Sequence, residues 1–233
     1  MRFRAIFFDA GETLVHPHPS FPELFATVLE REGFPVGVDA VHEQLHHVGD
    51  RFAQAAREEE LWNTSPERSR SFWLSVYARF LDALRLPTDD GLHETLYREF
   101  TDLANYALFD DVAPPIGALR AAGPVLGVVS NFEEWLERLL GQLGVLESFD
   151  VRVISGLEGM EKPDPRIYRL ALRRAGVEPS EAAFVGDSPE FDVDPPAAIG
   201  MFPVLIDRRD RYPAFTGPRI RTLTDLVSTL EAA

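Results

Sequence analysis

Residues 3–15 constrain this chain more than any other stretch, because they join a buried strand to a polar loop. The run at 6–8 is Ile-Phe-Phe, which is typical of a short strand buried on both faces of a parallel sheet. Asp9 follows at the carboxyl end of this strand, where parallel sheets usually bind ligands. Gly11 lets the backbone turn, and we expect the Thr13 hydroxyl to fasten the loop by hydrogen bonding.

Apolar runs of the same kind alternate with helical patterns after residue 113. Strands are predicted at 125–129, 149–154, 182–185 and 202–206. Helices are predicted from Pro114 to Gly123 and at 132–143, 166–175 and 222–230. Because strands that alternate with helices imply right-handed crossovers, the sequence predicts an α/β fold with a three-layer, Rossmann-like parallel sheet.

The segment 16–105 has a different character, since alternating strand patterns are absent. A turn-rich hinge at 16–19 precedes a helix that Ser20 caps and Gly33 ends. Later helices are predicted by apolar residues three or four apart: Val41 to Phe52 in one helix beginning at Asp39, then Phe72 to Leu84, then Leu92 to Leu103. We therefore expect an all-helical cap domain at 16–105 and a core domain formed by 1–15 and 106–233.

Polar residues follow the predicted strands of the core. Ser130 and Asn131 end the strand at 125–129, and Asp187 follows the strand at 182–185. The carboxyl ends of parallel strands meet at one edge, so Asp9, Ser130 and Asp187 are expected to converge on one crevice. Lys162 lies in a proline-rich loop between them.

In order and spacing, these motifs resemble those of the haloacid dehalogenase superfamily, whose members are mostly Mg²⁺-dependent phosphatases. The family's first motif, Asp-x-Asp-x-Thr, is matched by Asp9 and Thr13, with Gly11 in place of the second Asp. The second is matched by Ser130, the third by Lys162-Pro163, and the fourth by Gly186-Asp187 followed by Asp192. The helical insertion occupies the place of the family's helical cap.

The resemblance implies a role for each matched residue. Asp9 would be the nucleophile that forms an aspartyl-phosphate, and Asp9, Asp187 and the Gly11 carbonyl would hold Mg²⁺. Asp192 would position Lys162 or the metal's waters. Thr13, Ser130, Asn131 and Lys162 would bind the phosphate, and Ser130, Asn131 and Lys162 also count as catalytic.

Lys162 has further weight because lysine and arginine together number 23 and it is the only lysine. An ammonium is a compact charge, and the broad planar fork of arginine does not replace it at a crowded phosphate.

Gly11 is the main departure from the family, because the Asp usually found there protonates the leaving group and activates water. Glycine cannot do this, so the leaving group is expected to depart largely unaided unless Glu12, His16 or His18 supplies the proton. A phosphonatase also needs a cap lysine, which this chain lacks. A 2-haloacid dehalogenase-like hydrolase and a non-catalytic relative that binds a phosphorylated ligand stay open beside the phosphatase.

The predicted cap contains other candidate residues. His42 and His46 are four apart and could share a helix face, but no third ligand completes a metal site there. The aromatic residues Trp62, Trp73 and Tyr77 could line a substrate pocket, but they are expected to form part of the hydrophobic core of the cap.

Composition limits the kinds of molecule that the protein is expected to bind. A formal net charge of -15 argues against nucleic acid and anionic membranes, and zero cysteines exclude thiolate ligands and nucleophiles. No apolar stretch is long enough to span a bilayer and no signal peptide is evident, so we expect a cytoplasmic protein. A small phosphorylated metabolite is the expected substrate, and the chain is expected to be a monomer or homodimer.

Overall fold

The computed structural model describes residues 2–88 and 91–233. The chain divides into two compact units: Met1–Val15 with Leu108–Ala233, and His16–Ala107. The first is called the core unit below, and the second the helical unit. That the helical unit acts as a cap stays a prediction.

A parallel six-stranded sheet forms the centre of the core unit, in the order β5-β4-β1-β6-β7-β8. Its neighbouring strands pair in parallel, and β1 lies between β4 and β6. The strands are β1 Ala5–Phe8, β4 Val125–Ser130, β5 Val151–Ile154, β6 Ala182–Gly186, β7 Phe202–Ile206 and β8 Arg219–Ile220. This confirms the predicted Rossmann-like α/β core, and the buried residues of β1 agree with a strand covered on both faces.

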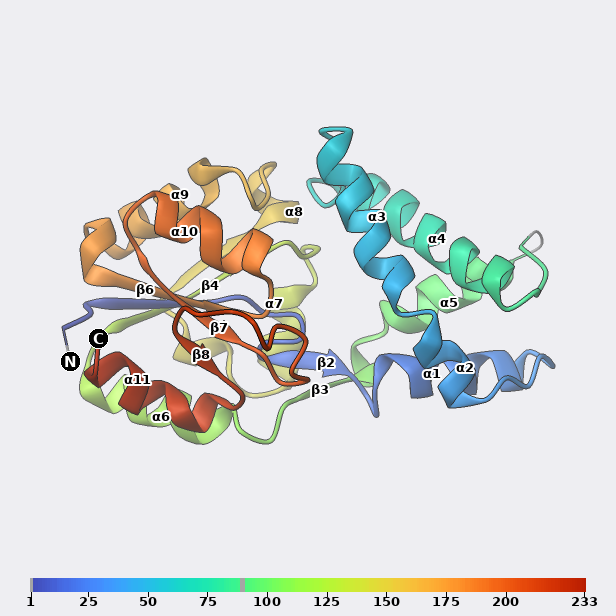
Figure 1. Cartoon of the computed structure of the whole chain (residues 1–233), viewed down its shortest axis with the longest axis horizontal. Helices are drawn as coiled ribbons and strands as arrows, with labels where there is room; N and C mark the ends of the chain where they lie inside the picture. Colours follow the sequence, from blue (N-terminus) through green and yellow to red (C-terminus); the bar gives the residue numbers. More distant parts are fainter. Residues whose placement is uncertain (1, 89–90) are drawn as a thin grey trace. The chain divides into compact units, whose positions relative to one another are not determined.

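Helices cover both faces of this sheet (Figure 1), with α6 and α11 on one side and α9 and α10 on the other. The helices of the core unit are α6 Ala113–Ala122, α7 Leu136–Gln142, α8 Ser155–Glu158, α9 Pro165–Ala175, α10 Asp194–Ala198 and α11 Leu226–Glu231. Gly123 and Gly176 end α6 and α9 with positive φ, as their places in the sequence predict.

The helical unit contains α1 Phe21–Arg31, α2 Val38–Glu43, α3 His46–Arg57, α4 Pro66–Ala83 and α5 Leu92–Phe100. Ser20 caps α1 by accepting a hydrogen bond from the Glu23 backbone N–H at 3.3 Å. The unit has its own aromatic core, in which Trp62 and Tyr77 are buried and Trp73 is partly buried. This confirms the favoured use of these three residues as core.

One predicted helix is two. The periodic pattern from Asp39 to Phe52 is interrupted at 44–45, between α2 and α3. His42 therefore belongs to α2 and His46 to α3, and the prediction of a shared helix face is wrong. His46 instead lies near His47 and Asp50, with the possible ligand atoms of these three within 4.8 Å of one another.

Helix α7 begins at Leu136, four residues later than the pattern predicts. The reason lies in contacts of the Phe132 backbone with a distant segment. Its N–H donates to Ser155 Oγ at 3.0 Å, and its carbonyl accepts from the Gly156 N–H at 3.1 Å. The Phe132 carbonyl, which would accept from the Leu136 N–H in a helix starting there, is thus engaged elsewhere.

The all-helical prediction for 16–105 also fails at its edges. A two-stranded sheet pairs β2 Val15–Pro17 with β3 Tyr106–Leu108, where the chain passes between the units. The expected hinge at 16–19 thus begins as a strand. Two other elements are shorter than predicted: α5 ends at Phe100, with a 3₁₀ turn at Leu103–Asn105, and α11 follows a 3₁₀ turn at Leu223–Asp225.

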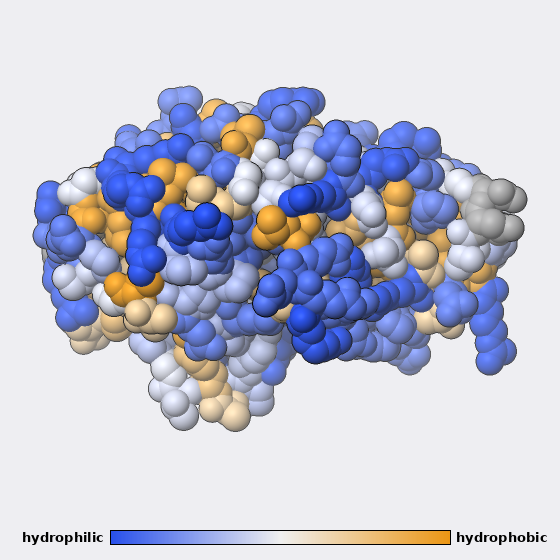
Figure 2. All heavy atoms as spheres, turned by 90° about the horizontal axis from the view of Figure 1, so that it is seen from above, coloured by the Kyte–Doolittle hydropathy of each residue, from blue (hydrophilic) through white to orange (hydrophobic). Residues whose placement is uncertain are grey.

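The surface is largely polar. On the face shown in Figure 2, hydrophilic residues predominate and hydrophobic residues form small separate groups. Among the described residues, no helix has the length and apolar character that crossing a membrane requires.

Gly127 offers a test of sheet packing. A Cβ atom there would lie 2.7 Å from Phe7 Cδ1 and 3.1 Å from the Val151 carbonyl oxygen. Because Phe7 is fully buried, the ring has little room to move. We expect Gly127→Ala to lower the free energy of unfolding by about 1–3 kcal/mol, measured by urea denaturation.

Gly117→Ala is the matched control. This glycine lies inside α6, and a Cβ there meets nothing within 4 Å. Alanine should leave stability unchanged or raise it by up to about 1 kcal/mol. Equal effects of the two substitutions would contradict the packing of Phe7 against Gly127.

Candidate active site

Three neighbouring strands supply the centre of the site. Asp9 follows β1, Ser130 ends β4 and Asp187 follows β6, and these strands are adjacent in the sheet. The Asp9 N–H donates to the Val185 carbonyl at 2.9 Å, which continues the β1–β6 pairing to the edge. Ser130 Oγ donates to Asp9 Oδ1 at 2.9 Å. The structure thus brings the three predicted strand-end residues to one edge.

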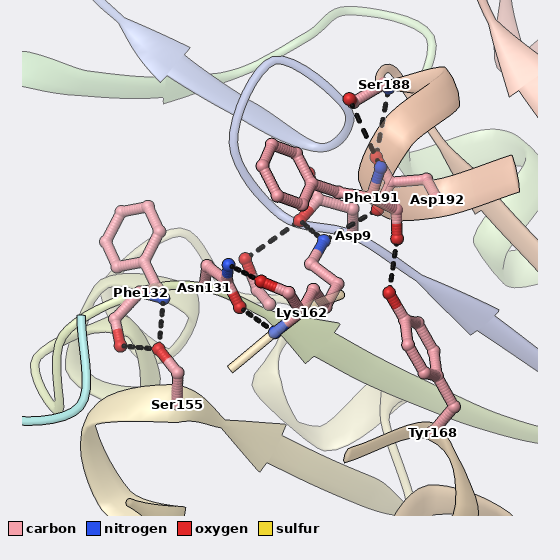
Figure 3. A network of polar contacts seen from close by, with 10 residues as sticks. Asp9, Asn131, Phe132, Ser155, Lys162, Tyr168, Ser188, Phe191 and Asp192 are labelled. Carbon is pink, nitrogen blue, oxygen red and sulfur yellow. Dashed lines mark hydrogen bonds and ion pairs between the residues drawn. The ribbon is translucent and has the colours of Figure 1, made fainter. Parts of the chain in front are cut away.

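Lys162 joins this group through its ammonium (Figure 3). Its Nζ donates to Asp9 Oδ1 at 2.7 Å and to Asp192 Oδ1 at 2.6 Å. The Lys162 side chain is only 3% exposed, and those of Asp9 and Asp192 are 9% and 1% exposed. Burial favours the neutral amine, but Asp192 and Asp9 outweigh it and raise the pKa of Lys162 well above its ordinary value. The lysine is therefore charged.

Asn131 fixes the backbone that carries Lys162. Its Oδ1 accepts from the Lys162 N–H at 2.7 Å, and its Nδ2 donates to the Lys162 carbonyl at 2.8 Å. Its amide thus holds the loop of the third motif against the end of β4, as Figure 3 shows. The predicted contact of Asn131 with substrate stays a prediction.

Asp192 lies in a π-helical turn, Pro189–Val193, just after β6. Its Oδ2 accepts from the Ser188 N–H at 3.0 Å while Oδ1 faces Lys162. A Cβ atom on Gly186 would collide with the Asp192 side chain. The glycine of the fourth motif therefore makes room for the carboxylate that binds the lysine.

The carboxylates of Asp9, Asp187 and Asp192 form one cluster, with one oxygen atom of each within 4.8 Å of the others. Burial raises the pKa of Asp187 to about 7; Asp9 and Asp192 add to the rise, and Arg211 opposes it. Three carboxylates at this spacing need cations to remain charged together. An all-oxygen set of this kind fits a hard divalent cation.

The loop after β1 differs from the prediction in one respect. Thr13 is fully buried, but its hydroxyl has no hydrogen-bond partner among the described residues, so it does not fasten the loop. Backbone bonds do so: the Leu14 and Val15 N–H groups both donate to the Ala10 carbonyl, at 2.8 and 2.9 Å. A phosphate contact of Thr13 stays a prediction.

Glu12, one of the candidates to replace the missing acid, has an ion-pair partner. Its Oε2 lies 2.8 Å from Arg209 Nη2. His16 Nδ1 lies 2.7 Å from the Pro17 carbonyl oxygen, in a different unit from Asp9. That His16 or His18 reaches a substrate stays a prediction.

The arginines after β7 were missed by the sequence reasoning. Arg208 Nη2 donates to the Thr13 carbonyl at 2.9 Å, and Arg211 Nη2 donates to Asp187 Oδ2 at 2.6 Å. The signal was available, because three arginines fall within five residues of a predicted strand's carboxyl end. Together with Arg209 they place cationic side chains along the loop after β1 and the loop after β6.

Comparison with known proteins places this site in a family. A family model described as a haloacid dehalogenase-like hydrolase matches residues 3–200. The chain therefore belongs to the haloacid dehalogenase-like hydrolases and is a hydrolase of that family. This confirms the resemblance stated from the motifs.

The relatives are named for different activities. Haloacid dehalogenase-like hydrolase domain-containing protein 3 of Homo sapiens is 31% identical over 212 residues, 88% of this chain and 82% of that protein. A glyceraldehyde 3-phosphate phosphatase of Methanopyrus kandleri is 37% identical over 144 residues, 56% of this chain and 60% of that protein. The (S)-2-haloacid dehalogenase 1 of a Pseudomonas species is 30% identical over 196 residues, 78% of this chain and 84% of that protein.

Solved structures share the fold. The Bacillus subtilis HAD-hydrolase YfnB bound to magnesium has a TM-score of 0.79 at 18% identity, and 99% of each chain is covered.

The buried lysine can be tested by removing its charge. In Lys162→Met the carboxylates of Asp9 and Asp192 lose their cation, so we expect the free energy of unfolding to fall by about 3–5 kcal/mol near neutral pH. Burial already raises the pKa of Asp192. In the variant, Asp192 of the folded protein should bind a proton at a higher pH than it does in the unfolded chain. The loss of stability should therefore become smaller as the pH falls toward about 5.

The double variant Lys162→Met with Asp192→Asn is the control. Replacing the Asp192 carboxylate, which has lost its cation, should recover part of the lost stability at neutral pH. Additive losses in the double variant would mean that Lys162 and Asp192 do not interact.

Proposed function

We propose that the chain is a Mg²⁺-dependent phosphatase that acts on a small phosphorylated metabolite through an aspartyl-phosphate on Asp9. The observation that carries this proposal is the charged Lys162 bound to Asp9 beside a three-carboxylate cluster. Phosphoryl transfer requires a nucleophile in line with the leaving group and cations around the equatorial oxygens.

The hydrogen bonds of Asp9 support a role as nucleophile. Ser130 Oγ and Lys162 Nζ both donate to Oδ1, so they set the orientation of the carboxylate, and neither of them engages Oδ2. Attack on phosphorus forms the Asp9–phosphate bond, and the bond to the leaving oxygen breaks. Water then attacks the phosphoenzyme, which releases inorganic phosphate and restores the Asp9 carboxylate.

Lys162 is placed to bind the phosphate as well. An ammonium has three donors, and Asp9 and Asp192 account for two of them. The third is available to a phosphoryl oxygen. A guanidinium would need more room than this buried position gives, which agrees with a lysine here in a chain otherwise rich in arginine.

The carboxylate cluster fits Mg²⁺, which prefers oxygen ligands and keeps several waters. Asp9, Asp187 and the Gly11 carbonyl would hold the ion, and Asp192 would bind its waters or position Lys162. When bound, the cation would neutralise charge on the phosphoryl group. The chain's own residues orient that group and supply the nucleophile.

The absence of an acid at Gly11 shapes the expected specificity. Glu12 is paired with Arg209, so in this arrangement it does not replace the acid. The leaving group would then depart largely without a proton, which favours aryl and acyl phosphates over alkyl phosphates.

A 2-haloacid dehalogenase-like activity is the second candidate. The missing acid and the (S)-2-haloacid dehalogenase among the relatives favour it. The carboxylate cluster around Asp187 argues against it, because displacement of halide by Asp9 needs no cation at phosphate oxygens.

A substrate panel with and without a chelator separates these candidates. We expect phosphate release from aryl and acyl phosphates with Mg²⁺, and its loss with excess chelator, because the cluster would then lack the cation. Metal-independent halide release from 2-haloacids would support the dehalogenase instead. No phosphate or halide release from either substrate class would indicate a relative that only binds a phosphorylated ligand.

Gly11→Asp tests the missing acid. A Cβ at Gly11 would meet only Phe132 Cε2, at an ordinary contact distance of 3.9 Å, so the substitution fits the backbone. We expect alkyl-phosphate turnover to rise by up to about 10²-fold and aryl-phosphate turnover to change little.

The matched measurement is a leaving-group series on the unmodified protein at saturating Mg²⁺. Turnover should fall steeply as the pKa of the leaving alcohol rises. A flat series, with chemistry shown to be rate-limiting, would mean that another residue supplies the proton. Glu12→Gln would then be the next variant to measure.

A further inference from the structure

The loop after β7 places Arg211 against a carboxylate of the site. Arg211 Nη2 lies 2.6 Å from Asp187 Oδ2, with side chains that are 45% and 18% exposed. Asp187 is one of the three clustered carboxylates, so this guanidinium competes with any metal ion for one of its oxygens.

The loop that carries Arg211 is held rigidly by a buried carboxylate. Asp207 is fully buried, and it accepts from the Arg211 N–H at 2.8 Å and from the Tyr212 N–H at 2.9 Å. Arg219 Nη1 donates to the same carboxylate at 3.1 Å. Since these bonds involve the backbone of Arg211, its side chain can leave Asp187 while its Cα stays at the rim of the site.

The charges of the site give a reason for such a movement. When all three are ionised, the carboxylates of Asp9, Asp187 and Asp192 carry three negative charges, and Lys162 and Arg211 carry two positive charges. A divalent cation together with Lys162 balances the three carboxylates without Arg211. The guanidinium would then be repelled, and a phosphate brought by the substrate would be the anion within its reach.

We propose that Arg211 is an exchangeable counterion that pairs with Asp187 in the metal-free protein and binds the substrate's phosphate once Mg²⁺ has displaced it. This inference rests on the proposed function, because it needs Mg²⁺ at Asp187. Its consequence is coupled binding: phosphate removes the competing guanidinium from Asp187, so metal and phosphate each raise the affinity for the other.

Titration calorimetry of Mg²⁺ on the whole chain tests this directly. In Arg211→Ala the competing cation is gone, so without phosphate Mg²⁺ should bind about two- to fivefold more tightly than in the unmodified protein. Inorganic phosphate should bind the Mg²⁺-saturated variant about tenfold more weakly, because a charge-assisted hydrogen bond is lost. The rise in Mg²⁺ affinity on adding phosphate should therefore diminish.

Arg209→Ala is the matched control. It removes the same charge from the same loop, but Arg209 pairs with Glu12 and not with the cluster. Its Mg²⁺ affinity should stay close to that of the unmodified protein. Arg211→Gln, which keeps much of the side-chain bulk, should behave like Arg211→Ala.

The outcomes are distinct. Unchanged or weaker Mg²⁺ binding in Arg211→Ala overturns the exchange. An equal gain in Mg²⁺ affinity in Arg209→Ala also overturns it, because the gain would then come from removing any positive charge near the site. If Mg²⁺ binds none of the proteins, the metal-dependent function fails and the exchange fails with it. Normal Mg²⁺ binding with no effect of Arg211 removes the exchange alone.

Discussion

The site depends on one buried ammonium shared between two buried carboxylates. Lys162 contacts Asp9 from the first strand and Asp192 from the turn after β6, at 2.7 and 2.6 Å. A charge buried this deeply is stable only when its partners are held in place. Asn131 holds the lysine backbone in place. The Ser188 N–H binds the Asp192 carboxylate, and Gly186 leaves room for it because it has no Cβ. Four separate segments thus fold around a single charge.

The chain divides its cations by shape. The compact lysine occupies the enclosed centre, where two carboxylates accept from two of its three donors. The broad guanidinium groups of Arg208, Arg209 and Arg211 lie at the rim, where each can donate to the oxygens of a loop. This arrangement gives a physical meaning to the single lysine among 23 basic residues.

Much of the core could be predicted because its signals are local. The apolar strands, the Ser20 cap, the glycine stops and the order of the motifs can all be read from neighbouring residues. Parallel strands bring their carboxyl ends together, so the convergence of Asp9, Ser130 and Asp187 also follows from pattern alone. The residue types of the site were identifiable for the same reason.

Tertiary contacts decided the rest. Helix α7 starts late because the Phe132 carbonyl accepts from Ser155, 23 residues away, and a period of three or four cannot reveal such a partner. Thr13 was expected to fasten its loop, but the Ala10 carbonyl already does so and Arg208 binds the Thr13 carbonyl. Arg211 meets Asp187 only because the loop after β7 folds back beside β6. The sequence by itself determined which polar groups end the strands of the sheet, because residue type and strand position are local properties. Which donor meets which acceptor was decided only by the tertiary structure, because those pairs come from segments far apart in the chain.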